Sequence, residues 1–178
     1  MHVSGRHARQ ANLLGALSLA INDRIRGALG DDAFGWSAAA ALVHMHFRPG
    51  KTIDFLARVL GVSHPAAVRL VDRLEDEGLL ERRPAPDGRA RALFLTQAGE
   101  LATTRILERR THALNELIAP LSAAERKQLE PLLEKLLSGV VENRWDARRV
   151  CRLCNPAICE LPDCPVDIAA GDPGKGSP

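Results

Sequence analysis

The chain has 178 residues, 46% of them hydrophobic and 26% charged, which is typical of a soluble globular protein of one compact domain with extensions. No apolar run reaches the roughly 18 residues of a membrane helix, and the N-terminus lacks the apolar core of a signal peptide. We therefore expect a cytoplasmic protein without a membrane partner. The formal net charge of +2 gives little support by itself to nucleic-acid binding.

Two helices are predicted in the first part of the chain, after a loose tail at residues 1–8. An apolar residue recurs at every fourth position over 9–29, which predicts a long amphipathic helix. This stripe consists of Leu13, Leu17, Ile21, Ile25 and Leu29. A short apolar helix is predicted at 36–47. Its His44 and His46 are candidate ligand residues, but side chains at i and i+2 point apart on a helix, which favours ordinary structural histidines.

The next two predicted helices, at 53–62 and 63–78, are joined by a tight turn that contains a glycine. Thr52 is a candidate cap of the first, and Ser63 is a good N-cap of the second. Gly78 is expected to end the second helix in a left-handed conformation. The two expected buried faces are Ile53, Leu56, Ala57 and Leu60 on the first helix, and Ala67, Leu70, Val71 and Leu74 on the second. This arrangement predicts a helix-turn-helix.

A β-hairpin is predicted after the helix-turn-helix, with strands at 80–83 and 91–96, so the unit is a winged helix. Its arginines cluster within ten residues, with only Asp87 against them, which is the electrostatic footprint of a DNA-facing wing. These arginines are Arg82, Arg83, Arg89 and Arg91. The chain has no Tyr and only 3% aromatic residues, so stacking platforms for single strands or RNA are scarce. Duplex DNA is the favoured partner.

The outward face of the second helix combines short groups with long cations, which suits a surface that lies in a groove. Arg69 can bind guanine with both ends of its guanidinium, Val68 can touch a thymine methyl, and His64 can donate to a base or phosphate. Arg73 is a candidate phosphate contact or a partner of a neighbouring carboxylate. A solvated surface is the alternative for any single cation. The full predicted DNA-contacting set is Ser63, His64, Pro65, Val68, Arg69, Arg73, Arg82, Arg83, Asp87, Arg89 and Arg91.

Four motifs in this part of the chain resemble the MarR family of winged-helix transcriptional regulators, and the likeness covers about residues 10–145. They are Leu-Val-Asp-Arg-Leu-Glu (70–75), Gly-Leu-Leu-Glu-Arg-Arg-Pro (78–84), Asp-Gly-Arg (87–89) and Leu-Thr-Gln-Ala-Gly (95–99). The resemblance implies that Arg89 of the wing enters the minor groove, while Asp87 steadies the turn or pairs with Arg89. It also implies that a signal, such as a small-molecule effector, changes operator binding. Ala66 and Val68 stand where hydroxyl residues are frequent in the family, so DNA shape is expected to contribute more here.

Two more long helices are predicted after the wing, at 97–119 and 122–144. Thr96 can cap the first, and Ser122 with Glu125 forms a capping box for the second. Leu129, Leu133, Leu136 and Val140 then step by four, three and four residues, a seam that requires a partner helix. The outer helices carry more apolar surface than a small winged helix can cover. This favours a two-fold dimer over an intramolecular bundle.

All the cysteines lie near the C-terminus, in the pattern C-x2-C-x4-C-x4-C. They are Cys151, Cys154, Cys159 and Cys164. Four thiolates that converge match tetrahedral zinc or an iron–sulfur cluster. The run is similar to the C-terminal [2Fe–2S] loop of redox-sensing MerR-family regulators, although its internal spacing differs. Iron–sulfur and zinc both remain open, as do a thiol switch and four unrelated thiols.

The predicted fold is mainly α with a small β-hairpin wing: a winged helix-turn-helix with long helices that form a dimerisation region. The predicted segments are a tail at 1–8, a winged-helix domain at 9–145 (DNA-binding core 48–96, dimerisation helices 9–29 and 97–145), a cysteine cluster at 146–165 and a disordered tail at 166–178. No phosphate-loop, dinucleotide or hydrolase motif is present, so an enzyme is not expected.

The sequence thus predicts a homodimeric regulator of an operator, a repressor, that senses redox state or metal through its cysteines. One alternative is a metal-cluster redox protein or electron carrier that uses the winged helix for protein interaction. The basic wing argues against this alternative, because a module that binds only proteins has no need of clustered arginines. Another is a nonspecific architectural DNA binder.

Overall fold

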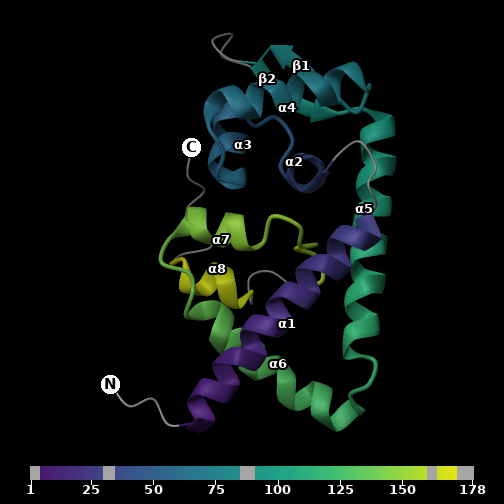
Figure 1. The fold of residues 1–178 in the computed structure, drawn as a ribbon. Coiled ribbons are helices and arrows are strands. Elements are labelled where there is room, and N and C mark those ends of the chain that lie inside the picture. The colour runs from purple at the N-terminus through teal and green to yellow at the C-terminus, as the bar shows by residue number, and fades with distance from the viewer. Residues whose placement is uncertain (1–4, 30–34, 85–90, 160–163, 172–178) are drawn as a thin grey trace.

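The structure is a computed structural model that describes residues 5–29, 35–84, 91–159 and 164–171. It is mainly helical, with one two-stranded antiparallel sheet, as predicted (Figure 1). None of the helices in the described part of the chain combines the length and apolarity that crossing a membrane requires. The helices are α1 (Gly5–Leu29), α2 (Gly35–Phe47), α3 (Ile53–Leu60), α4 (His64–Asp76), α5 (Gln97–Ile118), α6 (Ala123–Ser138), α7 (Arg144–Val150) and α8 (Pro165–Ala169), and the strands are β1 (Leu80–Pro84) and β2 (Arg91–Leu95).

The main hydrophobic core lies between α2, α3, α4, the hairpin and the first turns of α5. The predicted inward faces are confirmed for α4, and α3 adds Val59, which the helical spacing missed. Ile53 and Leu60 of α3 are only partly buried and pack at the edge of this core. The largest side chains of the core that are almost fully buried are Leu42, Met45, Leu56, Leu74, Leu80 and Leu93.

The ends of α3 and α4 follow the predicted caps, with one exception. Thr52 accepts from the backbone N–H of Phe55 at 3.3 Å. Gly78 has φ +70° and donates to the carbonyl of Glu75, as in a Schellman motif. Ser63 stands at the N-cap of α4, but its hydroxyl makes no capping bond. Pro65 at the second helical position has no N–H, which removes one of the two groups from which a capping hydroxyl can accept.

The hairpin pairs Leu80 with Leu95 and Pro84 with Arg91, so both strands lie where they were predicted. A short bridge from Lys51 to Leu93 attaches the segment before α3 to the sheet. The wing is therefore hydrogen-bonded to both ends of the helix-turn-helix region, which fixes where it stands relative to α4.

Gly99 explains the closeness of the wing and α5. A Cβ on this residue would lie 2.0 Å from the carbonyl oxygen of Leu79, so only glycine lets the helix approach the strand. The hydroxyl of Thr96 accepts from the N–H of Gly99 at 3.1 Å, which confirms the predicted cap, and donates to the carbonyl of Gly78. The Thr-Gln-Ala-Gly run is thus the joint between the wing and the long helix.

The long helices α1, α5 and α6 extend away from the wing, and α5 runs along one side of the molecule to reach α6 (Figure 1). α1 packs against α5, and Arg24 forms an ion pair with Glu116 across them at 3.5 Å. Of the predicted α1 stripe, Ile25 is buried, whereas Leu13 and Leu17 are exposed. α1 begins at Gly5, so the predicted tail at 1–8 was too long. Its first turns are exposed and polar, and therefore carry no apolar periodicity that would mark the start.

The C-terminal part differs from the prediction in two places. The helix expected at 122–144 ends at Ser138, because Gly139 caps it and Asn143 starts α7 by accepting from the N–H groups of Trp145 and Asp146. The tail expected to be disordered from 166 onward contains α8, whose Val166 packs in a second small core with Val141. The capping box of Ser122 and Glu125 is confirmed.

Candidate nucleic-acid interface

The recognition helix α4 has one buried and one exposed face. Ala67 and Leu70 lie in the core, whereas Pro65, Arg69 and Arg73 are exposed and Val68 is half-buried. Arg69 has no hydrogen bond or ion pair within the described residues, so its guanidinium is available to a ligand. The helix therefore presents its predicted contact residues to solvent.

His64, at the first position of α4, is engaged within the protein. Its Nδ1 donates to Asp54 of α3, at 2.6 Å. Both side chains are exposed. A DNA contact through Nδ1 would have to replace this bond, whereas Nε2 makes no hydrogen bond within the described residues.

Arg82 of the wing has partners on the recognition helix. Its guanidinium lies between Asp72 and Glu75 of α4 and forms ion pairs with both, and its backbone N–H also donates to Glu75. Although burial opposes the charged form, the bonds to Asp72 and Glu75 raise the pKa of Arg82 above its usual value. Arg82 therefore fastens the wing to the recognition helix, and a DNA contact through its guanidinium would compete with these two ion pairs.

The remaining wing residues are placed only in part. Arg83 is exposed, bonds Glu81 through its Nε at 2.9 Å and stacks over the ring of Phe94 at 4.7 Å. Arg91, at the start of β2, is exposed. The two predicted wing-tip residues, Asp87 and Arg89, lie outside the described residues.

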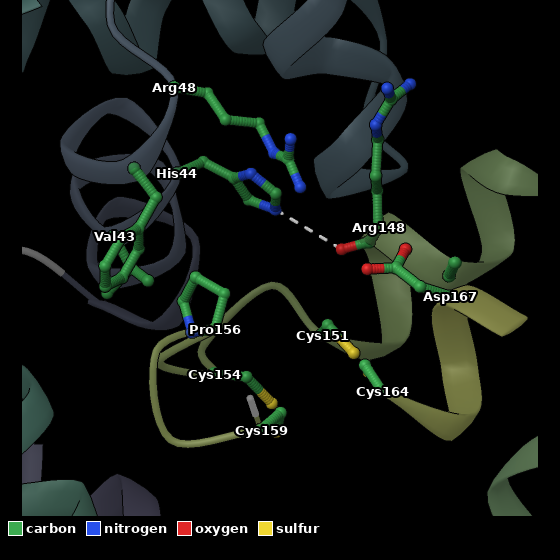
Figure 2. Close-up of a pocket in the computed structure, with 12 residues that line it drawn as sticks. Val43, His44, Arg48, Arg148, Cys151, Cys154, Pro156, Cys159, Cys164 and Asp167 are labelled. Atoms are coloured by element: carbon green, nitrogen blue, oxygen red, sulfur yellow. Dashed lines mark hydrogen bonds between the residues drawn. The ribbon is translucent and has the colours of Figure 1, made fainter. Parts of the chain in front are cut away.

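The four predicted metal ligands line one cavity of about 50 Å³, beside the winged helix (Figure 2). Cys151 caps α7, Cys154 and Cys159 belong to the following loop, and Cys164 caps α8. In Figure 2 the four side chains gather on one side of the cavity, with His44 and Arg48 of the winged helix at the other. All four thiols are free. Within the described residues, no three His, Cys, Asp or Glu side chains already stand in a metal-coordinating arrangement.

The thiols nevertheless act on one another. A hydrogen bond from the Cys151 thiol is the main cause that lowers the pKa of Cys154 to about 6, with Arg110 and Arg152 adding to the effect. The same bond, followed by burial, raises the pKa of Cys151. Burial raises the pKa of Cys159, and the nearby charge of Cys164 adds to this. These shifts in pKa favour the thiolate form of Cys154 over those of Cys151 and Cys159.

Helix α7 attaches the cysteine segment to the helix-turn-helix. Trp145 packs against Phe55 of α3, with ring centroids 5.7 Å apart, and the guanidinium of Arg58 lies 3.8 Å above the indole. His44 of α2 donates from Nε2 to the carbonyl of Arg148 at 3.3 Å (Figure 2). The packing of Trp145 on the helix-turn-helix was not predicted from the sequence. As one of only two tryptophans in the chain, Trp145 was a candidate for such a contact.

The histidines of α2 are structural, as the sequence favoured. Burial lowers the pKa of His44 to about 4, against the effect of its bond to Arg148, and the charge of Arg48 lowers it further. His46 forms an ion pair with Glu100 of α5. Neither histidine has a second ligand-type partner within the described residues.

Comparison with known proteins agrees with this geometry. Residues 35–91 match the model of the MarR family. The wild-type MarR of E. coli in its apo form is 24% identical, with a TM-score of 0.61 over 77% of this chain and 99% of that one. A MarR family protein from Bacillus stearothermophilus is 23% identical, with a TM-score of 0.68 over 76% and 96%.

A third structure shares the same fold. MepR, a transcription regulator of the Staphylococcus aureus multidrug efflux pump MepA, is 21% identical, with a TM-score of 0.65 over 72% of this chain and 96% of that one. The matched region contains α2, α3, α4 and β1, which are the elements that build the predicted DNA-binding face. Residues 35–91 are thus similar to the MarR family, and the chain shares the winged-helix fold of these solved structures.

Proposed function

We propose that the protein is a sequence-specific regulator of transcription that binds a double-stranded DNA operator as a homodimer and acts as a repressor. The observation that carries this proposal is the exposed face of α4. A recognition helix lies in the major groove and reads base edges with residues near its N-terminus. Arg69 is exposed there without an internal partner within the described residues.

The wing supports the same docking. Arg82 ties β1 to α4 through Asp72 and Glu75, so the wing and the recognition helix are held as one unit before DNA arrives. Such preorganisation lowers the ordering cost of binding. The exposed Arg91 at the base of the wing then adds positive charge beside the groove.

A homodimer is supported by the apolar surface that one chain leaves open. Leu13, Leu14 and Leu17 of α1 and Leu132, Leu133 and Leu136 of α6 are all exposed. Both helices lie in the half of the molecule away from the wing (Figure 1). A second copy that covers this surface would leave both winged helices free to contact the half-sites of a palindrome.

The test is selection of duplexes from a random library by the full chain, followed by affinity measurements on the selected sequence. Arg69→Ala should weaken binding to the selected site by roughly 1–3 kcal/mol and relax base preference at one position. Arg91→Ala should weaken all duplexes alike and lower the slope of log affinity against log salt by about one.

Lys127→Ala is the matched control, because it removes an exposed cation from α6, in the half of the molecule away from the wing. It should leave both the affinity and the salt slope near wild type. No enrichment of any sequence would contradict a specific regulator and support a nonspecific architectural binder. The docking model is wrong if Arg69→Ala and Arg91→Ala both bind as the wild type does.

A further inference from the structure

The cysteine cavity is not explained by DNA binding. The chain has only four cysteines, and all four line this one cavity, although they come from the ends of two helices and the loop between them. Thiols that served only as small buried apolar groups would have no reason to collect here and nowhere else. This placement indicates a ligand that all four sulfur atoms can bind together.

We propose that Cys151, Cys154, Cys159 and Cys164 form a tetrathiolate metal site that takes one zinc ion or one [2Fe–2S] cluster per chain. Both the zinc ion and the cluster can be bound by four cysteine thiolates. One Zn²⁺ with four thiolates carries a net charge of −2. Two Fe³⁺ with two S²⁻ and four thiolates carry the same −2, so the surroundings must offset the same charge in either case.

The surroundings provide positive charge for this purpose. Arg110 of α5 lies beside one of the four thiols, and its Nη2 donates to the Sγ of Cys154 at 3.8 Å. The Nε of Arg110 is buried and has no hydrogen-bond partner within the described residues. A buried cation with an unused donor is costly unless an anion lies beside it. Paired disulfides would be neutral and would leave Arg110 without that anion, so the cation favours metal-bound thiolates.

The small size of the C-terminal core supports the same conclusion. Its buried members are Val141, Ala147, Cys164 and Val166. So few apolar side chains cannot by themselves offset the entropy lost in ordering α7, the loop and α8. Structural metal sites provide folding free energy to small segments of this kind.

Leu153 links the site to the winged helix. It stands between Cys151 and Cys154 in sequence, is buried and belongs to the main core. This contact holds the first two ligands in place, whereas Cys159 is exposed. Uptake of metal thus requires the thiols to draw together and lose their protons to solvent, up to four per ion. The bound metal would fasten α8 to α7, which packs against α3.

The proposal does not rest on DNA binding, and its test measures metal directly. The full chain, free of any affinity tag, is purified without oxygen and divided between Zn²⁺ and ferric iron with sulfide. Each sample is then desalted and analysed for zinc, iron and sulfide. We expect either one zinc, or two irons with two sulfides and visible absorption, per chain. A third sample receives zinc and iron with sulfide together, and the metal that it retains after desalting is the one the site prefers.

Cys154→Ser and Cys159→Ser should each lose that metal, whereas Ala157→Ser, in the same loop, should keep it. Circular dichroism of each variant establishes that the winged helix is folded. Retention of neither zinc nor iron by the wild type would overturn the proposal. So would equal retention by the two cysteine variants, or four thiols that react with a thiol reagent equally fast with and without metal.

A second measurement tests the fastening and does not depend on the variants. Trypsin can cut after Arg149, an exposed residue of α7, and after Arg152 in the loop. Metal should slow these cuts by about tenfold or more, since each 1.4 kcal/mol of added closing free energy gives a factor of about ten. Cuts after the exposed Arg105 of α5 should be unchanged. Equal cutting at Arg149 with and without metal would contradict a site that holds α7 in place.

Discussion

The winged helix and the long helices α1 and α6 use their apolar residues in opposite ways. In the winged helix, Leu42, Leu56 and Leu93 are fully buried by residues of the same chain. Helix α6 contributes no buried residue, and its Leu133 and Leu136 are 45% and 52% exposed. Val140, just beyond the helix, is 61% exposed. One part of the molecule completes its core alone, and the other presents a face that a second chain can complete.

This difference indicates that the winged helix provides the stability of the fold, whereas α1 and α6 provide the surface for the proposed association of two chains. Clustered exposed leucines are typical of interaction surfaces, which agrees with the proposed dimer. Substitutions in the winged helix should therefore change the free energy of unfolding, whereas substitutions in α6 should change association. Each of the following experiments can break or sharpen that division.

The largest effect is expected from Leu133→Asp combined with Leu136→Asp. In a dimer that covers α6, the two aspartates of each chain would be buried without partners. We expect the dissociation constant to rise by more than about a thousandfold, which corresponds to about 4 kcal/mol. Analytical ultracentrifugation measures it, and circular dichroism should show an intact winged helix.

Lys127→Asp is the control for this pair. It changes the net charge by the same −2 but lies on the opposite face of α6, at 100° per residue. It should leave the dimer intact. A wild-type protein that sediments as a monomer at micromolar concentration would remove the basis for the comparison.

A smaller effect is expected from Gly99→Ala in the winged helix. Its Cβ would meet the carbonyl oxygen of Leu79 at 2.0 Å, and backbone cannot move aside as a side chain can. Overpacking of this kind should lower the free energy of unfolding by about 3 kcal/mol. Gly27→Ala in α1 meets nothing within 4 Å and should raise it by up to about 1 kcal/mol. Urea denaturation compares the two, and equal effects would contradict the division.

The next effect is a dependence on pH that originates in the winged helix. The pKa of His44 is lowered from 6.5 to about 4 in the folded state, so the unfolded chain takes up the proton first as pH falls. Its contribution to stability is complete above pH 6.5 and is lost on the way down to pH 4. Between pH 7 and pH 5 the loss should be about 2 kcal/mol.

His44→Gln should remove this loss, because glutamine does not titrate. His112→Gln replaces an exposed histidine of α5 and should keep the pH dependence of the wild type. Urea denaturation at the two pH values gives the comparison. If His44→Gln loses as much stability as the wild type, burial does not hold this histidine neutral.

The smallest effect comes from the helix caps. Thr52→Ala and Ser122→Ala each remove a side-chain bond to a helix N-terminus, which should weaken the structure by about 1 kcal/mol. Thr52→Ala should lower the protection of amides throughout the winged helix. Ser122→Ala should lower protection only in α6. Hydrogen exchange distinguishes these patterns, and a global effect of Ser122→Ala would show that α6 folds with the winged helix as one unit.

Local chemistry in the sequence determined most of the winged helix. The buried face of α4 follows from 3.6 residues per turn, and the ends of the helices follow from Thr52, Gly78 and Thr96, whose side chains or conformations act within a few residues. The capping box of Ser122 and Glu125 is equally local. Such features can be predicted because the interacting groups are near each other along the chain.

Contacts between distant residues could not be predicted, because nothing in the local pattern chooses the partner. Arg82 belongs to a basic cluster in the sequence, yet the fold places it between Asp72 and Glu75. Gly139 and Asn143 alone are weak signals that a helix ends and another begins. The break between α6 and α7 allows Trp145 to pack on Phe55, a contact that the local sequence does not indicate. The sequence determined that four cysteines lie near the C-terminus, and the tertiary structure decided that they face one cavity beside Arg110, because only folding brings α5, α7 and α8 together.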